Sequence, residues 1–202
     1  RRRPDAVVVL GGYASVPCGS AAVVLRIPIL VAEQNAIPGA ANRLLGRFAR
    51  ACAVSFQGTS LPRSVVTGNP VRQAIRRAAM DGGSRVEARQ SLGIGDRPFV
   101  VAFGGSLGSR QINRATTAAV ENWTGCPVVL QHVIGQRGWS VGPGERALSV
   151  PAVVDYRPVE YEEDMATVLS AADLVVCRAG ATTVAELSVL GVPAVLVPLP
   201  GA

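Results

Sequence analysis

Short aliphatic runs alternate with amphipathic segments along the whole chain, and this alternation is typical of an α/β protein. The runs are closed by glycine, proline or polar residues, which predicts strands buried in a parallel sheet. The predicted strands cover residues 6–10, 27–31, 52–56, 64–67, 98–103, 127–131, 152–156, 174–177 and 194–197. The predicted helices cover residues 15–25, 40–51, 85–92, 164–171 and 181–190, with others after residue 73 and from the turn at 104–109 to about residue 120. Residues 135–145 are predicted to be a glycine-rich loop.

The same local pattern occurs three times, as VVVLGGYAS, VVAFGGSLGS and LVVCRAGATT. In each case an aliphatic strand gives way to small residues just before a helix. This repetition predicts two Rossmann-like sheets. Residues 73–97 are richer in charge and contain Gly82-Gly83, so we expect a linker there and domains at residues 1–72 and 73–202.

The last repeat, within residues 174–198, has a sequence suited to phosphate binding. Gly180 separates a strand from a helix, and the N–H groups at such a helix start bind phosphates in open α/β sheets. Thr182 and Thr183 add hydroxyl groups, and Glu186 lies on the same helix face, where its carboxylate can accept hydrogen bonds from a ribose. The alternative is a capping box formed by Thr183 and Glu186 without any ligand.

The charge of the chain suits anionic partners of limited size. All 20 basic residues are arginine, the net charge is +6, and only 4% of the residues are aromatic. Charge that is spread along the chain with few aromatics argues against a nucleic-acid stacking platform. It favours polyanionic small ligands or an anionic membrane surface.

The cysteine and histidine content argues against zinc chemistry. The four cysteines form no CxxC pair, and there is one histidine, His132. We expect reduced thiols of a cytosolic protein, with no membrane span and no signal peptide. The chain starts at arginines without methionine and stops directly after a predicted strand, which suggests a fragment of a longer protein.

Several reaction classes lack their sequence motifs. There is no GxSxG nucleophile elbow, and residues 104–108 lack the lysine of a P-loop. The same turn departs from GxGxxG and has no acidic residue closing the next strand, which disfavours hydride transfer. The remaining candidates, Arg72, Ser106, Thr182, Thr183 and Glu186, suit a nucleotide diphosphate. The alternatives are a solvated loop arginine for Arg72 and a helix N-cap for Ser106.

Six motifs in one order resemble a known family. GGYASVPCG, AEQNAIPGAANR, GNPVR, GGSLGSRQIN, YEEDM and CRAGATTVAEL follow one another as in the MurG family of bacterial N-acetylglucosaminyltransferases. The resemblance implies a GT-B fold with two Rossmann-like domains, both incomplete here. Residues 1–72 would be the later part of the acceptor domain, and residues 73–202 the first part of the donor domain. The implied reaction moves GlcNAc from UDP-GlcNAc to undecaprenyl-pyrophosphoryl-MurNAc-pentapeptide (lipid I), giving lipid II for peptidoglycan.

The resemblance also assigns roles to individual residues. The implied donor-binding residues are Arg72, Ser106, Glu162, Ala181, Thr182, Thr183 and Glu186. Among these, Glu162 is implied to meet uracil through its main chain and Glu186 to bind the ribose. The implied acceptor-binding residues are Gly11, Gly12, Tyr13, Ser15, Glu33, Gln34 and Asn35.

Three positions depart from the family pattern. Ala32 replaces the usual histidine, Leu107 replaces a glutamine, and Glu162 stands where an apolar residue is usual. The usual catalytic base lies outside these residues, and His132 is expected to be structural rather than catalytic. The chain alone is therefore expected to be inactive.

The resemblance further implies an inverting transfer that needs no obligatory metal and no cofactor besides the UDP-GlcNAc substrate. The protein would lie peripherally on the cytoplasmic face of the bacterial plasma membrane, on an anionic surface, without nucleic-acid partners. One alternative is another UDP-sugar enzyme, either a glycolipid glycosyltransferase or a UDP-GlcNAc 2-epimerase. The other is a non-catalytic sugar-nucleotide-binding module that needs a partner lobe.

Overall fold

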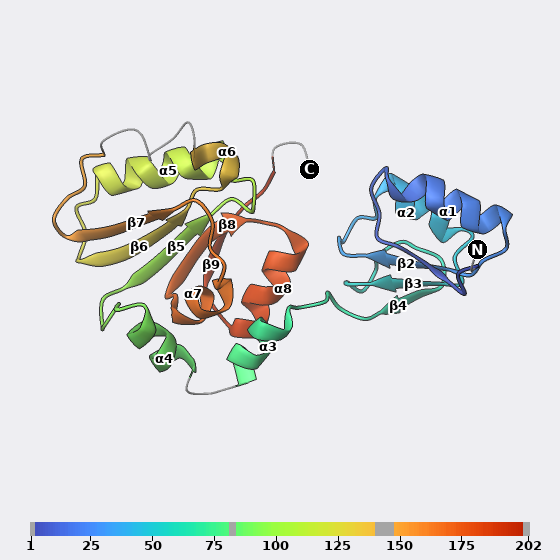
Figure 1. The fold of residues 1–202 in the computed structure, drawn as a ribbon, viewed down its shortest axis with the longest axis horizontal. Helices are drawn as coiled ribbons and strands as arrows, with labels where there is room; N and C mark the ends of the chain where they lie inside the picture. Colours follow the sequence, from blue (N-terminus) through green and yellow to red (C-terminus); the bar gives the residue numbers. More distant parts are fainter. Residues whose placement is uncertain (1–2, 81–83, 140–147, 200–202) are drawn as a thin grey trace. The chain divides into compact units, whose positions relative to one another are not determined.

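The computed structural model describes residues 3–80, 84–139 and 148–199 and divides the chain into two compact units (Figure 1). The first unit is Arg1–Pro70 and the second unit is Val71–Ala202. Each unit contains one parallel sheet with helices packed on it. The boundary between the units lies after residue 70, two residues before the predicted boundary after residue 72. Arg72 therefore belongs to the second unit.

The first unit is a four-stranded parallel sheet in the order β1-β2-β3-β4. Its elements are β1 Val7–Val9, α1 Ser15–Val24, β2 Ile29–Glu33, α2 Ala40–Gly46, β3 Ala51–Val54 and β4 Ser64–Val66. Because each strand is added on the same side of the one before, right-handed crossovers place α1 and α2 on one face of the sheet (Figure 1). An aliphatic core forms between them, in which Val31, Leu45 and Cys52 are almost fully buried.

The second unit is a five-stranded parallel sheet in the order β7-β6-β5-β8-β9. Its strands are β5 Phe99–Phe103, β6 Val128–Val133, β7 Val154–Val159, β8 Leu174–Arg178 and β9 Ala194–Val197. The central strand β5 is buried on both faces, as its unbroken apolar sequence predicts, and it pairs with β6 on one side and β8 on the other. Its helices are α3 Gln73–Met80, α4 Ser84–Ser91, α5 Arg110–Glu121, α6 Gln136–Trp139, α7 Met165–Ala171 and α8 Ala181–Leu190.

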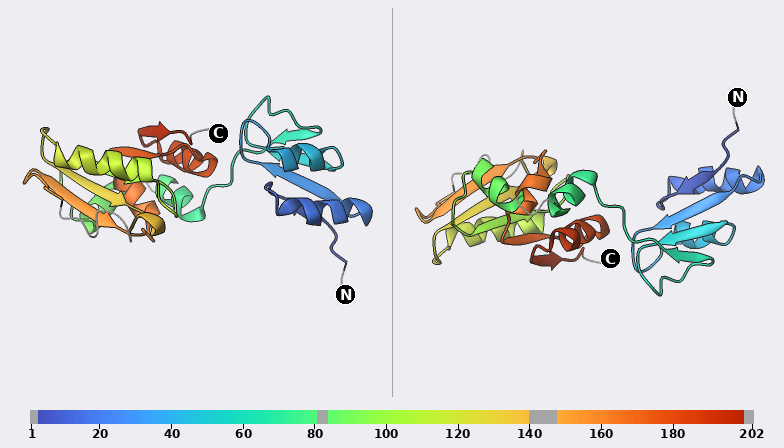
Figure 2. Two further views of the ribbon diagram at one scale, coloured as in Figure 1. Left: turned by 90° about the horizontal axis from the view of Figure 1, so that it is seen from above. Right: turned by 90° about the horizontal axis from the view of Figure 1, so that it is seen from below.

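All strands of this sheet are parallel, but the side on which the next strand is added changes between β5 and β8. From β5 the chain proceeds through α5 to β6 on one side, whereas from β8 it proceeds through α8 to β9 on the other. Right-handed crossovers therefore place α5 on one face and α8 with α7 on the opposite face (Figures 1 and 2). The carboxyl ends of β5 and β8 are a topological switch point, which is where open α/β sheets bind ligands.

Several segments differ from the sequence-based prediction. Strand β7 covers Val154–Val159 rather than residues 152–156. Residues 32 and 33 extend β2, because they pair with Ala53 and Val54 of β3. The helix predicted for residues 40–51 ends at Gly46, since Ala51 is needed opposite Leu30 in the sheet. Residues 136–139, which were predicted to be loop, form the short helix α6, and residues 140–147 lie outside the described part of the chain. Within the described residues, none of the helices has the length and apolar character that a membrane crossing requires.

Candidate functional site

A small cavity lies beside the switch point of the second unit, on the side of α7 and α8. Its volume is about 140 Å³. It is lined by Arg72, Phe103, Gly105, Ser106, Val133, Tyr161, Glu162, Met165, Leu169, Thr183 and Glu186. We call it the Arg72–Glu186 cavity. Its volume is below the ~300 Å³ of a typical ligand pocket, so it can receive a ring of a nucleotide rather than the whole molecule.

An ion pair between Arg72 and Glu186 forms one wall of this cavity. Arg72 Nε donates to Glu186 Oε1 at 2.6 Å, and Arg72 Nη2 donates to Glu186 Oε2 at 3.0 Å. The Glu186 residue is only 4% exposed, whereas the Arg72 side chain is 55% exposed. The hydrogen bonds to Glu186 raise the pKa of Arg72 above its usual value. Each carboxylate oxygen retains a further acceptor lone pair, so Glu186 can still receive two hydroxyl groups.

The N-cap of α8 and the ion pair each exclude one of the alternatives left open by the sequence. Helix α8 has Gly180 as its N-cap, without a side-chain cap bond, so Thr183 and Glu186 do not form a capping box. Arg72 is not merely a solvated loop arginine, because its guanidinium is fixed on a buried carboxylate.

Glu162 contributes to the cavity through its place in a small hydrogen-bond network. Its Oε2 accepts a hydrogen bond from Gln131 Nε2 at 2.6 Å, and its Oε1 accepts one from the backbone N–H of Asp164 at 2.9 Å. Both carboxylate oxygens therefore fix the turn before α7, leaving the Glu162 main chain for a ligand. Gln131 was not among the predicted site residues, because only the pairing of β6 with β7 brings residues 131 and 162 together.

The glycine turn after β5 also borders the cavity. Gly105 and Ser106 line the cavity, whereas Ser109 is the N-cap of α5 and accepts a hydrogen bond from Ile112 N at 3.4 Å. The N-cap alternative for Ser106 is therefore wrong. Arg72, Ser106, Glu162, Thr183 and Glu186 share one cavity, as the donor-site prediction requires. Ala181 and Thr182 are outside its lining, on the first turn of α8.

The glycine turn is fixed by very close backbone packing. Gly108 has a φ of +81°, and a Cβ on it would lie 2.2 Å from Ile134 O. Gly135 has a φ of +83°, and a Cβ on it would lie 2.2 Å from Gly108 N. Only glycine fits at both positions, because neither backbone can retreat. Ile134 and Gly135, which follow β6, thereby determine where the turn and its Ser106 lie. The glycine pattern at residues 104–108 alone does not reveal this contact.

His132 is structural, as expected. It is 0% exposed. Its Nε2–H donates to Asn113 Oδ1 at 3.1 Å, because Asn113 Nδ2 already donates to Ile134 O, and its Nδ1 accepts from the Tyr156 hydroxyl at 2.8 Å. Burial lowers the pKa of His132 to about 4. A neutral imidazole that uses both nitrogens in this way ties β6 to β7 and α5.

This histidine predicts a pH dependence of stability. In the unfolded chain it titrates near 6.5, and in the folded chain near 4. Between these values the unfolded state binds more protons, so stability falls as the pH falls. Lowering the pH from 7.5 to 5 is expected to decrease the free energy of unfolding by about 2 kcal/mol through His132. Urea unfolding followed by tryptophan fluorescence measures this in the second unit, since it contains both tryptophans, Trp123 and Trp139.

The matched variant is His132→Gln, which can still form hydrogen bonds but cannot titrate. Its loss of stability between these two pH values should be smaller by the same amount. An equal loss in both proteins would show that His132 is not the group responsible.

In the first unit, Glu33 organises the loop after β2. Its Oε1 accepts from the backbone N–H of Asn35 at 2.9 Å, and its Oε2 accepts from Gly39 N at 3.0 Å and from Asn42 Nδ2 at 2.9 Å. Burial alone would raise the pKa of Glu33, but these hydrogen bonds outweigh it and lower that pKa. Glu33 is 4% exposed, so its carboxylate holds the loop in place instead of forming an open wall for a ligand.

The other predicted acceptor residues lie at the carboxyl ends of β1 and β2. Gly11 and Gly12 both have positive φ, Tyr13 is 95% exposed, and Ser15 begins α1 and donates to Gly12 O at 2.8 Å. Gln34 and Asn35 follow β2 directly, and Gln34 O accepts a hydrogen bond from Asn69 Nδ2 at 3.3 Å.

Asn42 was missed by the sequence analysis. It is 1% exposed, and its Nδ2 lies 3.1 Å from the position of a Cβ on Gly11. Its Oδ1 is buried without a hydrogen-bond partner among the described residues. This unpaired acceptor next to the glycine turn makes Asn42 a further candidate ligand contact. Its spacing in the sequence gives no signal, because only the packing of α2 on β1 and β2 brings it there.

The cysteines are free in the described structure. Cys52 and Cys177 are buried, and burial raises the pKa of both thiols, that of Cys177 to about 11. Cys18 and Cys126 are exposed. Among the residues that the structure describes, no group of three or more His, Cys, Asp or Glu side chains could hold a metal ion.

Comparison with known proteins identifies the family. Residues 99–202 match the glycosyltransferase family 28 C-terminal domain, and residues 1–54 match the glycosyltransferase family 28 N-terminal domain. The chain belongs to glycosyltransferase family 28. Both parallel sheets are Rossmann-like, and the fold of this family member is of the GT-B type.

Similar proteins of this family include bacterial transferases. A UDP-N-acetylglucosamine–N-acetylmuramyl-(pentapeptide) pyrophosphoryl-undecaprenol N-acetylglucosamine transferase from a Nocardioides species is 43% identical over 99% of this chain and 54% of its own length. The crystal structure of Acinetobacter baumannii MurG superimposes on this chain with a TM-score of 0.72, and the two sequences are 35% identical. The alignment covers 98% of this chain and 53% of that structure. The chain thus spans about half the length of the curated relatives it matches.

A more distant likeness concerns the fold alone. The UDP-GlcNAc 2-epimerase from Neisseria meningitidis, whose crystal structure has UDP-GlcNAc bound, is 15% identical with a TM-score of 0.60. The alignment covers 96% of this chain and 58% of that structure.

Proposed function

We propose that this chain is part of an N-acetylglucosaminyltransferase that moves GlcNAc from UDP-GlcNAc to lipid I, giving lipid II. The second unit would bind the donor and the first unit the lipid-linked acceptor. The observation that carries the donor assignment is the convergence of Arg72, Ser106, Glu162, Thr183 and Glu186 on one cavity at the switch point. These residues come from four separate segments, with Thr183 and Glu186 both on α8, and a shared ligand accounts for their meeting.

The cavity and the adjoining first turn of α8 together have a suitable group for each part of a uridine diphosphate. The main chain at Glu162 can pair with the base, because the carboxylate holds that turn in place. Glu186 can accept both ribose hydroxyls while Arg72 keeps it oriented. The backbone N–H groups and the hydroxyls of Thr182 and Thr183, at the start of α8, suit the diphosphate.

The reaction that we propose inverts the anomeric centre in one displacement. The acceptor sugar hydroxyl forms a bond to the anomeric carbon as the bond from that carbon to the diphosphate oxygen breaks. The hydroxyl proton goes to a base, and UDP leaves with its added negative charge. The positive end of α8 and the Arg72 guanidinium would stabilise this charge, so we propose no obligatory metal or cofactor.

The acceptor and the location are part of the same proposal. Gly11, Gly12 and Tyr13 suit the pyrophosphate of a lipid-linked acceptor, because a turn with glycines at positive φ can direct successive backbone N–H groups at an anion. The net charge of +6 favours an anionic membrane surface, which supports a peripheral position on the cytoplasmic face.

Calorimetry with UDP tests the donor assignment. The 202-residue chain is expected to bind UDP at least about tenfold more tightly than CDP or ADP, since a main-chain contact to the base can discriminate between bases. Equal affinity for all three diphosphates would contradict a uridine site.

A turnover assay with UDP-GlcNAc and lipid I separates the alternatives for the complete protein. Lipid II as product favours the transferase, and UDP-ManNAc as product favours a 2-epimerase. Binding of UDP without either product, in a complete protein, favours a non-catalytic module.

A further inference from the structure

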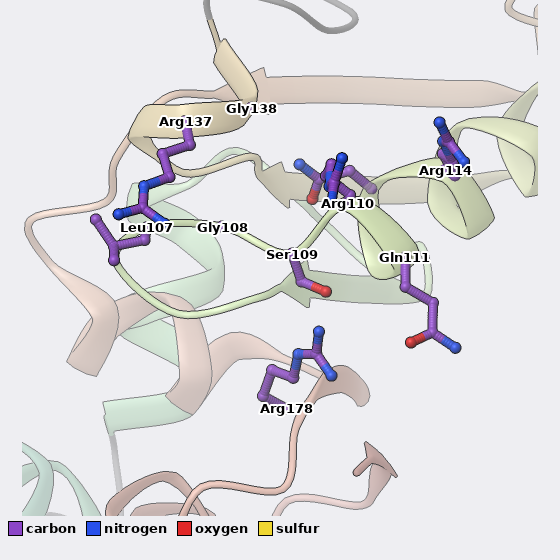
Figure 3. Close-up of a pocket in the computed structure, with 10 residues that line it drawn as sticks. Leu107, Gly108, Ser109, Arg110, Gln111, Arg114, Arg137, Gly138 and Arg178 are labelled. Atoms are coloured by element: carbon purple, nitrogen blue, oxygen red, sulfur yellow. The ribbon is translucent and has the colours of Figure 1, made fainter. Parts of the chain in front are cut away.

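A second, larger cavity lies on the other side of the glycine turn, between α5, α6 and the end of β8 (Figure 3). Its volume is about 790 Å³. Its lining shares no residue with the Arg72–Glu186 cavity. The proposed donor site therefore leaves it unexplained.

Four arginines line this cavity, which we call the arginine cavity: Arg110, Arg114, Arg137 and Arg178. They come from α5, α6 and β8. Arg178 extends from β8 toward Ser109, and Arg137 extends from α6 toward Leu107 and Gly108 (Figure 3). The other lining residues are glycine, leucine, serine, glutamine and asparagine, so among the described residues no carboxylate lines the cavity beside the four guanidinium groups.

The positive charge of the arginine cavity is not neutralised within the described structure. The ion pairs between described residues of this unit involve Arg72, Arg85, Arg89, Arg97 and Arg157. None of them includes an arginine of the cavity. Arg178 is held in place because its Nη1 donates to Pro198 O at 3.0 Å, which leaves its other N–H groups available.

The backbone adds to this positive potential. Helix α5 begins at Arg110, and its first N–H groups have no acceptor within the helix, although Ser109 Oγ caps Ile112 N. The positive end of a helix of 12 residues therefore faces the same cavity as the guanidinium groups. A lone carboxylate would leave most of this charge unmatched, whereas a phosphate carries more charge and accepts bidentate arginine forks.

We propose that the arginine cavity is a second anion site, which binds a phosphate or diphosphate group. The group comes either from a small molecule in solution or from a lipid headgroup. The site is distinct from the proposed uridine diphosphate site, and it does not depend on that function.

Calorimetry with inorganic pyrophosphate, at low ionic strength, tests the small-molecule source. In the 202-residue chain, the double variant Arg110→Gln with Arg137→Gln is expected to bind pyrophosphate about 100-fold more weakly, at roughly tenfold for each lost charged contact. The matched control is Arg76→Gln with Arg77→Gln, which removes the same charge from exposed positions on α3. Its affinity should change less than about twofold, and tryptophan fluorescence confirms that each variant is folded.

Co-sedimentation with phosphatidylcholine vesicles, with and without phosphatidylglycerol, tests the lipid source. Binding that requires phosphatidylglycerol and is lost only in the cavity variant would identify a lipid headgroup. Loss of pyrophosphate binding alone would identify a free ligand. If neither probe binds, or if both double variants lose binding equally, the arginine cavity is not an anion site. Neither experiment uses UDP, so the result is independent of the proposed transferase function.

Discussion

Replacing Gly108 with alanine is expected to destabilise the second unit by roughly 3–5 kcal/mol and to abolish UDP binding. The new Cβ would lie 2.2 Å from the backbone oxygen of Ile134, at a φ of +81° that alanine rarely adopts. Ile134 directly follows β6; its oxygen accepts a hydrogen bond from Asn113 Nδ2 and its N–H donates to Val159 O, so moving this backbone would break both bonds. The turn must shift instead, and Ser106 then leaves the Arg72–Glu186 cavity. Urea unfolding by tryptophan fluorescence and calorimetry with UDP measure the two effects.

The control for this variant is Gly191→Ala. Gly191 also has a positive φ, +68°, but a Cβ there meets nothing within 4 Å. It ends α8, so the expected cost is only about 1 kcal/mol, with UDP affinity unchanged. If Gly108→Ala behaves like Gly191→Ala, close packing of the turn against residues 134 and 135 does not position the site.

Changing Glu186 to glutamine is expected to weaken UDP binding by about 10- to 100-fold. The substitution preserves the shape of the side chain and removes the charge that would strengthen its hydrogen bonds to the ribose. It also removes the charge that fixes Arg72, so both residues lose their orientation. Calorimetry with UDP gives the change in Kd, and the fluorescence unfolding curve shows whether the second unit remains folded.

Glu163→Gln is the matched control, because it removes the same charge from an exposed residue of this unit outside the cavity lining. Its UDP affinity should stay within about twofold of the unmodified chain. An unchanged Kd for UDP in Glu186→Gln would contradict a ribose contact, and the ion pair with Arg72 would then have a structural role alone.

Much of the fold could be predicted from the sequence, because local patterns record it. The apolar runs identify the buried strands, and glycine and proline mark most of the turns between them. The errors arose where tertiary pairing overrides local preference. Residues 40–51 have helical spacing throughout, yet Ala51 pairs with Leu30 and the helix ends at Gly46.

The candidate site was predictable only in part. Thr183 and Glu186 could be selected from their spacing at a helix start, and Arg72 and Ser106 from their place beside turns. Their partners could not be predicted, because 114 positions separate Arg72 from Glu186 and 31 separate Gln131 from Glu162. No local pattern records contacts over such distances along the chain.

The sequence by itself determined which residues could bind a phosphate or a ribose, since that ability follows from side-chain chemistry and from the small residues at helix starts. Only the tertiary structure decided which of them share a cavity. The strand order reverses between β5 and β8, which brings their carboxyl ends together at the edge of the sheet. The same reversal places α5 and α8 on opposite faces, so the Arg72–Glu186 cavity and the arginine cavity form on either side of one glycine turn.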